Sequence, residues 1–294
     1  MARRPQHRDF PHLAGDDLGD VVLNLAPRAT RGGAAERDPN ESLVRWLLEA
    51  GVVELSHRFS DFSPPDDAAS IPAYGSVNDL IGTVSLAEVM TRYRELCQAH
   101  GQDPGQANKA LILRRWQYAS RYQRDLVAFV FRPSFHRARM ATIESDLARM
   151  TQTHTLGTLV ETLAVTETDA VQSQRLLQLQ LALVTAFPTH PEIQQRASES
   201  YAAQAAAWAR IYARIDRCYG LGLTASGAAV FSDLAILLST VVEGAHLRRQ
   251  ARAVNGELSD GSHVAVALVQ HVLVSMTGVP WSQLAVRSAT SSTG

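Results

Sequence analysis

The chain contains little cysteine. Cys97 and Cys218 are the only two cysteines among 294 residues, and they lie far apart in the sequence. A disulfide framework needs several cysteines and a zinc knuckle needs closely spaced ones, so the sequence excludes both. Isolated thiols are typical of proteins in a reducing compartment, and we expect a cytoplasmic protein.

Long apolar runs are also missing. No uninterrupted apolar segment approaches the roughly 18 to 20 residues that span a bilayer. The N-terminus, residues 1–10, is basic but has no apolar run behind it, unlike a secretory signal. We expect neither a membrane-spanning segment nor a secretory signal.

The short motifs of common catalytic sites are absent. The sequence has no Gly-x-Ser-x-Gly elbow, no His-Glu-x-x-His pair and no Walker sequence. Gly220 and Gly222 form a helix stop and not a nucleotide loop, because no strand precedes them. We therefore expect no enzymatic activity and no cofactor.

One enzymatic alternative is a carboxylate-bridged metal site. Two Glu-x-x-His pairs, Glu54/His57 and Glu243/His246, place a carboxylate and an imidazole on one face of a helix. A di-metal site also needs a glutamate from each of two further helices. The candidates for these positions are Glu161, Glu167 and Glu192. None of them lies in an apolar helical setting, so we expect no metal.

Lysine is nearly absent, and the basic residues are concentrated in one stretch. Lys109 is the only lysine, in a composition rich in alanine and arginine that is typical of bacterial genomes rich in G and C. Residues 108–140 carry 8 basic and 1 acidic side chain, whereas residues 1–107 carry 10 and 16 and residues 141–294 carry 10 and 12. Apolar residues recur through the basic stretch at helical spacing, which predicts a basic surface that holds a polyanion. The alternative is a solvated face, or arginines that pair with acids elsewhere in the chain.

Helical patterns cover most of the chain, and no convincing strand is predicted. The first firm helix begins near Asp38 with capping residues. The second begins at Ser85, which has the spacing of a capping box with Glu88. A basic helix follows and ends at Pro133. Further helices are expected at 136–151, 155–166, 169–187, 189–219, 224–252 and 262–277.

Three segments are predicted to be irregular. Residues 1–38 combine prolines, adjacent glycines and charges of both signs, and we expect a disordered tail. The alternative is an arm whose arginines reach a phosphate backbone. Residues 63–83 are rich in proline, glycine and aspartate and are predicted to form a loop. Residues 281–294 are predicted to be a flexible C-terminal tail.

Two helices near the C-terminus are apolar on nearly all sides. They span about 224–252 and 262–277. A helix that is apolar all round must be buried in a core or in a subunit interface. We expect a homodimer in which two helices of each chain form a four-helix seam. The alternative is the core of a monomeric bundle.

Several segments resemble the TetR family of bacterial transcriptional regulators. Leu43–Phe59 resembles the family's first helix, and Ser85–Met90 resembles the start of its second. Leu113–Val127 resembles the end of the recognition helix and the start of the fourth helix. The segment that begins at Phe187, with the long helix and the two apolar helices after it, resembles the regulatory domain. The resemblance covers about residues 41–280.

The resemblance implies an all-α fold in two parts. A three-helix helix-turn-helix head would occupy 39–134, with a long insertion at 63–83. A helical ligand-binding and dimerisation domain would occupy 135–280. The insertion and the turn His100–Asn108 are longer than in the family. The alternative is therefore a TetR-like helical protein that has lost operator binding and acts as an interaction module.

The function implied is a homodimeric regulator that binds double-stranded DNA and is gated by a small apolar effector. Trp116 is expected in the core. The DNA contacts expected from the resemblance are Lys109, Arg114, Arg115, Tyr118, Ser120 and Arg121. The large side chains available to line an effector pocket are Phe187, Trp208, Ile211, Tyr212 and Phe231.

Overall fold

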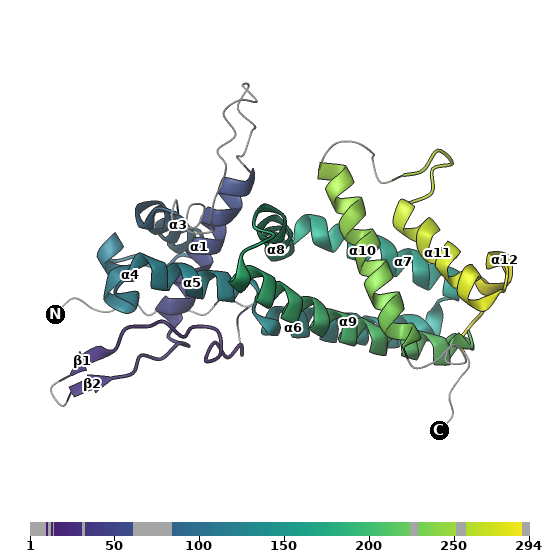
Figure 1. Ribbon diagram of the computed structural model, residues 1–294, viewed down its shortest axis with the longest axis horizontal. Helices are drawn as coiled ribbons and strands as arrows, with labels where there is room; N and C mark the ends of the chain where they lie inside the picture. The colour runs from purple at the N-terminus through teal and green to yellow at the C-terminus, as the bar shows by residue number, and fades with distance from the viewer. Residues whose placement is uncertain are drawn as a thin grey trace. The chain divides into compact units, whose positions relative to one another are not determined.

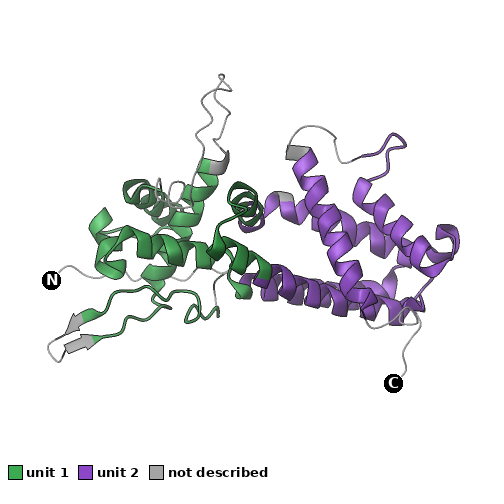
Figure 2. Ribbon diagram, viewed as in Figure 1, with its two compact units in different colours: residues 1–134, 179–198 green, residues 135–178, 199–294 purple. Residues whose placement is uncertain are grey.

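The computed structural model describes residues 10, 13, 15–30, 33–60, 84–223, 229–250 and 257–289. They form two compact units (Figure 2). The first unit comprises residues 1–134 and 179–198, and the second comprises residues 135–178 and 199–294. The described residues are predominantly helical, which confirms the all-α prediction. The predicted loop 63–83 lies outside the described residues.

The first unit is built on helices from the N-terminal half of the chain (Figure 1). They are α1 (Ser42–Ser60), α3 (Leu86–Ala99), α4 (Lys109–Trp116) and α5 (Ala119–Val130). α1 packs against α3 and α5, and α4 packs against both α3 and α5. The apolar positions that predicted these helices form the core, where Trp46, Leu47, Trp116, Tyr122 and Phe129 are fully buried.

Local sequence sets the beginning of α3, with one departure from the prediction. The side chain of Ser85 accepts a hydrogen bond from the backbone N–H of Ala87, so Ser85 caps the helix as expected. The carboxylate of Glu88 forms an ion pair with Arg58 of α1. The cap therefore lies on Ser85, and Glu88 helps to join two helices.

A glycine allows α1 and α5 to approach closely. A Cβ on Gly51 would lie 2.3 Å from the hydroxyl oxygen of Tyr122 and 2.8 Å from a methyl carbon of Leu126. The Tyr122 hydroxyl donates a hydrogen bond of 2.8 Å to the carbonyl oxygen of Leu47. The absence of a side chain at Gly51 thus makes room for a buried tyrosine and its hydrogen bond.

The predicted disorder of the N-terminal tail is wrong for residues 15–27, which we call the strap. Its Leu18, Val21 and Val22 are buried against the first unit. The carboxylate of Asp125 accepts hydrogen bonds from the backbone N–H groups of Leu23 and Asn24, at 3.1 Å each. α5 supplies the hydrogen-bond acceptor that holds this segment in place.

Two short strands follow the strap and correct the prediction of a chain without strands. β1 (Arg28–Thr30) and β2 (Gly33–Ala35) pair antiparallel, with Arg28 opposite Ala35. Each strand has only three residues, and small residues dominate both. A period-two apolar pattern cannot develop over so short a length, so the sequence carried no strand signal.

The first unit also contains a later part of the chain, residues 179–198. These residues include the end of α8 (Arg175–Ala186) and the beginning of α9 (Pro191–Tyr219). The side-chain amide of Gln180 donates a hydrogen bond of 2.7 Å to the backbone oxygen of Val130. The sequence predicts a single helical domain over 135–280, whereas residues 179–198 belong to the first unit.

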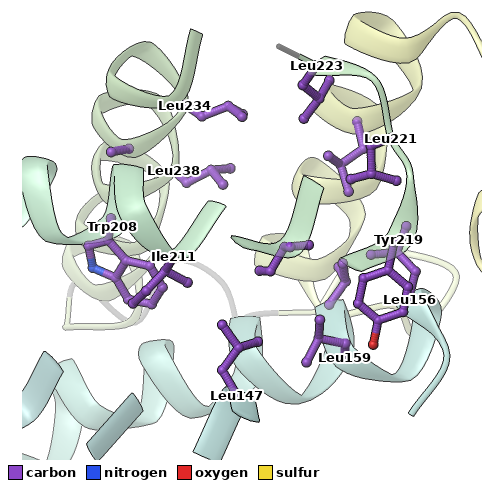
Figure 3. Close-up of a cluster of buried hydrophobic side chains, with 14 of the residues drawn as sticks. Leu147, Leu156, Leu159, Trp208, Ile211, Tyr219, Leu221, Leu223, Leu234 and Leu238 are labelled. Atoms are coloured by element: carbon purple, nitrogen blue, oxygen red, sulfur yellow. The ribbon is translucent and has the colours of Figure 1, made fainter. Parts of the chain in front are cut away.

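The second unit surrounds its own apolar core (Figure 3). Its remaining helices are α6 (Pro133–Thr153), α7 (Leu156–Ser173), α10 (Val230–Gln250), α11 (Val264–Thr277) and α12 (Trp281–Leu284). α7, α10 and α11 pack against one another. Buried side chains from several helices meet in this core, among them Leu147, Leu159, Trp208, Ile211, Leu234 and Leu238.

Two expectations for the second unit are corrected. The predicted break between 166 and 169 is absent, since α7 continues to Ser173 and ends where Gln174 takes an extended conformation. The predicted flexible tail is ordered as far as residue 289. Leu284 of α12 is fully buried, and Thr155 pairs with Ser288 in an isolated bridge. Residues 290–294 lie outside the described part of the chain.

Candidate nucleic-acid interface

The turn between α3 and α4 is long but held in place by hydrogen bonds. Gly101 adopts a φ of +63°, which suits a residue without a Cβ. The guanidinium of Arg94 on α3 donates to the backbone oxygen of Ala107, at 3.2 and 3.4 Å. The side chain of Asn108 then caps α4 by accepting from the N–H of Ala110 at 3.0 Å. The turn therefore fixes α4 relative to α3 despite its length.

One face of α4 is anchored in the core. Ile112 and Trp116 are fully buried, and the Trp116 assignment to the core is confirmed. The indole N–H of Trp116 donates a hydrogen bond of 2.8 Å to Asp125, and its ring contacts Tyr122 edge to face at 5.1 Å between centroids. The indole has a single N–H donor, and that donor is directed at Asp125 of α5. This bond therefore restrains the rotation of α4 about its own axis.

The opposite face of α4 is exposed. Lys109 and Arg114 are exposed, as predicted, and Leu113 between them is 36% exposed. Leu113 is one of the apolar residues that recur through the basic stretch, but it does not face the core. Its position four residues after Lys109 places it on the outer face instead.

The elbow between α4 and α5 adds further polar groups to this surface. Tyr118 is 56% exposed, and Ser120 is exposed. Arg121 is half-buried, with its guanidinium 5.5 Å from the centre of the Tyr118 ring. Arg124, one turn further along α5, is exposed and was not among the predicted site residues. Its position three residues after Arg121 was the signal that could have identified it.

Arg115 does not belong to this surface, contrary to the prediction. It is 8% exposed, and its guanidinium nitrogen lies 3.1 Å from a carboxylate oxygen of Glu41. The reason is helical periodicity, since Ile112, Arg115 and Trp116 follow the i, i+3, i+4 spacing of one face. The side chain therefore stabilises the first unit and is not available to a ligand.

Two other arginines of the basic stretch also pair with acids. Arg132 is buried, with its Nε 3.4 Å from a carboxylate oxygen of Asp16 in the strap. Arg139 of α6 forms an ion pair with Glu167 of α7. The alternative of pairing within the chain is thus correct for these two and for Arg115. The cationic surface is smaller than the net charge of the stretch suggested, and it is concentrated on α4 and the start of α5.

Four of the five predicted pocket residues belong to the second unit. Trp208 and Ile211 lie in its core, Tyr212 and Phe231 pack against that core, and the rings of Trp208 and Tyr212 stack with 5.5 Å between centroids. Phe187 is buried in the first unit instead, because residues 179–198 belong there. The five side chains therefore do not share one core.

Two half-buried glutamates of the second unit have raised pKa values. Burial raises the pKa of Glu167, although its ion pair with Arg139 opposes the shift. Burial also raises the pKa of Glu243, and the hydrogen bond from Tyr201 opposes it. Both glutamates had been candidates for metal ligands. Their hydrogen-bond partners are arginine and tyrosine side chains within the second unit.

The metal-site alternative gains no support from the arrangement of its other residues. Glu54 accepts hydrogen bonds from Arg58 and Arg92, at 3.0 and 3.1 Å. Glu192 pairs with Arg196 at 3.3 Å. Among the residues that the structure describes, no three His, Cys, Asp or Glu side chains come together to hold a metal ion.

α10 exposes apolar side chains on one face. Ile236, Leu237 and Leu247 are 57%, 53% and 44% exposed, and a Cβ on Gly244 would meet only open space. The segment Val230–Arg248 is long and apolar enough to cross a membrane by length and composition, and 33% of it is buried. The segment is not an uninterrupted apolar run, because Asp233 and Glu243 lie within it. Leu234 and Leu238 on the other face of α10 belong to the core.

The two surfaces differ in chemistry. The first unit carries a cationic face on α4 and the α4–α5 elbow, and the second unit carries an apolar face on α10. No protein-family model, no curated protein and no solved structure matches this chain. Its function must therefore be inferred from these surfaces.

Proposed function

We propose that the chain is a homodimeric DNA-binding transcriptional regulator of the helix-turn-helix type. The observation that carries the proposal is the two-sided character of α4. Its inner face is fixed by Ile112, Trp116 and Asp125, and its outer face exposes Lys109, Leu113 and Arg114. A helix held rigidly on one side and cationic on the other suits insertion into the major groove.

Each exposed side chain has a defined task in this proposal. Arg114 makes a bidentate contact to guanine or binds phosphate, and Lys109 binds phosphate. Leu113 offers methyl groups to the methyl group of thymine. The hydroxyl groups of Tyr118 and Ser120 and the guanidinium of Arg121 contact the backbone beside the groove.

The second unit supplies the dimer in this proposal. The exposed Ile236, Leu237 and Leu247 of α10 would be covered by the same face of a second copy, with α11 beside it. Gly244 lies on that face and permits close approach of the two helices. A two-fold dimer presents two copies of α4 to successive major grooves, about 34 Å apart.

A small apolar effector is the remaining part of the proposal. Trp208, Ile211, Tyr212 and Phe231 offer an aromatic and aliphatic environment in the second unit. An effector that binds these side chains changes DNA affinity only if it binds one conformation of the dimer better than the other. The proposal places this protein in the cytoplasm, where both DNA and effector are accessible.

Removing a cation from the outer face of α4 is expected to weaken DNA binding. Selection from a pool of random duplexes first yields a binding sequence, and fluorescence anisotropy then measures affinity at several salt concentrations. We expect Arg114→Ala to reduce affinity about 10- to 100-fold, because a bidentate base contact contributes about 1–3 kcal/mol. Lys109→Ala is expected to reduce the slope of log K against log salt by about 1.

The matched control for these variants is Arg149→Ala. Arg149 is on α6 in the second unit, and its side chain is 76% exposed, so the variant removes the same charge from a different surface. Arg149→Ala should leave both affinity and salt slope unchanged. Equal losses in all three variants, or weak and sequence-independent binding by the wild type, would contradict a specific interface on α4. Weak, sequence-independent binding by the wild type would favour the alternative of a helical interaction module that has lost operator binding. The internal ion pair of Arg115 is consistent with that alternative.

A charge placed on the exposed face of α10 is expected to separate the dimer. Leu237→Glu would bury a carboxylate against apolar groups of the partner copy, so sedimentation velocity should show a monomer. Val286→Glu is the control, because Val286 is 70% exposed and lies outside the helices of the proposed seam. A wild-type monomer, or a wild-type chain recovered only with membranes, would contradict the proposed seam.

A further inference from the structure

The β1–β2 hairpin is attached directly to the carboxyl end of α4. The backbone N–H of Ala26, just before β1, donates a hydrogen bond of 2.6 Å to the backbone oxygen of Arg115. The guanidinium of Arg37, just after β2, donates one of 2.6 Å to the backbone oxygen of Arg114. Both stems of the hairpin are thus bound to the last turn of α4.

Arg37 also joins the two stems to each other. Its Nε donates a hydrogen bond of 2.9 Å to the backbone oxygen of Ala26. The carbonyl groups at the end of a helix lack partners within the helix, so these bonds satisfy acceptors that would otherwise face water. Two hydrogen bonds therefore join the hairpin to α4, and a third joins its two stems.

The hairpin has little to hold it together on its own. It is a two-stranded ribbon, which is marginally stable in water without a further surface to pack on. Its strands contain Arg28, Thr30 and otherwise alanine and glycine. A narrow ribbon of small residues does not build a core, but it fits into or against a nucleic-acid groove.

The charges of the hairpin agree with such a role. Arg28 is exposed on β1, on an element bound to the helix that carries Lys109 and Arg114. Glu36 is exposed just after β2. The hairpin therefore carries one exposed cation, Arg28, and is followed by one exposed acid, Glu36, on a segment bonded to α4.

We propose that the hairpin is a second nucleic-acid contact, a wing that brings Arg28 to the phosphate backbone or minor groove beside the major groove occupied by α4. This inference rests on the proposed function, since it needs α4 to bind duplex DNA. It adds a separate element, built from the N-terminal segment, that lengthens the bound site at each end of the dimer.

Two variants with opposite expected effects on DNA affinity test the wing on the selected duplex. Arg28→Ala removes a phosphate contact and should lower affinity about three- to tenfold, with a salt slope smaller by about 1. Glu36→Gln removes a charge that repels phosphate and should raise affinity about two- to threefold. A general loss of folding cannot produce the second result.

Hydroxyl-radical footprinting gives an independent measurement. In the comparison variant, a short Gly-Ser linker replaces residues 28–35, which leaves Ala26 and Arg37 to keep their bonds to α4. The wild type should protect sugars beyond each α4 half-site, and the linker variant should lose only this outer protection. Unchanged affinity in Arg28→Ala and Glu36→Gln, with an unchanged footprint, would overturn the wing.

The two proposals fail in distinguishable ways. If Arg114→Ala weakens binding while the hairpin variants do not, the wing is wrong and the DNA-binding function of α4 stands. If the wild type selects no duplex at all, the proposed function fails and the wing fails with it.

Discussion

Gly51→Ala is expected to destabilise the first unit by about 2–4 kcal/mol and to abolish DNA binding. The new Cβ would lie 2.3 Å from the Tyr122 hydroxyl oxygen and less than 3 Å from both terminal methyl carbons of Leu126. Tyr122 is fully buried and cannot move away without losing its hydrogen bond to Leu47. The better helix propensity of alanine offsets only about 1 kcal/mol of this cost.

Urea unfolding followed by tryptophan fluorescence measures this loss, since Trp46 and Trp116 are both buried in the first unit. The matched experiment adds Tyr122→Phe to Gly51→Ala. Tyr122→Phe removes the hydroxyl oxygen that clashes with the new Cβ. The free energy of unfolding of the double variant should therefore be higher than the sum of the two single losses predicts. Strict additivity would show that the contact between Gly51 and Tyr122 is not the source of the destabilisation.

Asp125→Ala is expected to cost about 3–5 kcal/mol and to release the strap. The carboxylate accepts from two backbone N–H groups of the strap, from the Asn24 side chain at 2.6 Å and from the Trp116 indole at 2.8 Å. Removal leaves these donors without their acceptor in a buried region. Burial raises the pKa of Asp125, and the hydrogen bonds from Asn24 and Trp116 oppose that shift.

Amide hydrogen exchange shows whether the strap is released. Asp125→Ala should remove protection at Leu23 and Asn24, while amides in the middle of α7 keep theirs. Asn24→Ala is the smaller perturbation, because Asp125 keeps its bonds to both backbone N–H groups, and about 1 kcal/mol should be lost. Equal losses for the two variants would show that the side chain of Asn24, and not the shared carboxylate, holds the strap.

DNA binding should respond to Asp125 as well. Trp116 sets the rotation of α4 through its bond to this carboxylate, so Asp125→Ala allows Lys109 and Arg114 to turn away from a groove. We expect a loss of affinity larger than that for Arg28→Ala, measured on the same duplex. Affinity close to wild type would mean that packing of the indole ring alone holds α4.

The sequence predicted well where the determinants are local. Ser85 is predicted to cap a helix, and its side chain does so. The exposed positions of Lys109 and Arg114 follow from the helical period of α4. The same period predicts the burial of Arg115, which shares a helix face with Ile112 and Trp116. Grouping Arg115 with the neighbouring arginines by charge alone led to the wrong assignment.

Hydrogen-bond and ion-pair partners that lie far apart in the chain could not be predicted from the sequence. The strap is ordered by a carboxylate about 100 residues away, since Leu23 and Asp125 are separated by 102 positions. Nothing near Leu23 indicates that partner. Likewise, the sequence places Arg139 in the basic stretch, and only the fold brings Glu167 of the next helix beside it.

The passage of the chain between the units has a consequence for modular engineering. The divisions after residues 134, 178 and 198 all fall within helices, namely α6, α8 and α9. A fragment that ends at Ser134 lacks Gln180 and its bond to Val130, so it omits part of the unit that it is meant to isolate. A chimera made by a single crossover after residue 134 would separate residues 1–134 from residues 179–198 of the same unit. A chimera that is meant to keep the first unit intact must therefore include residues 179–198.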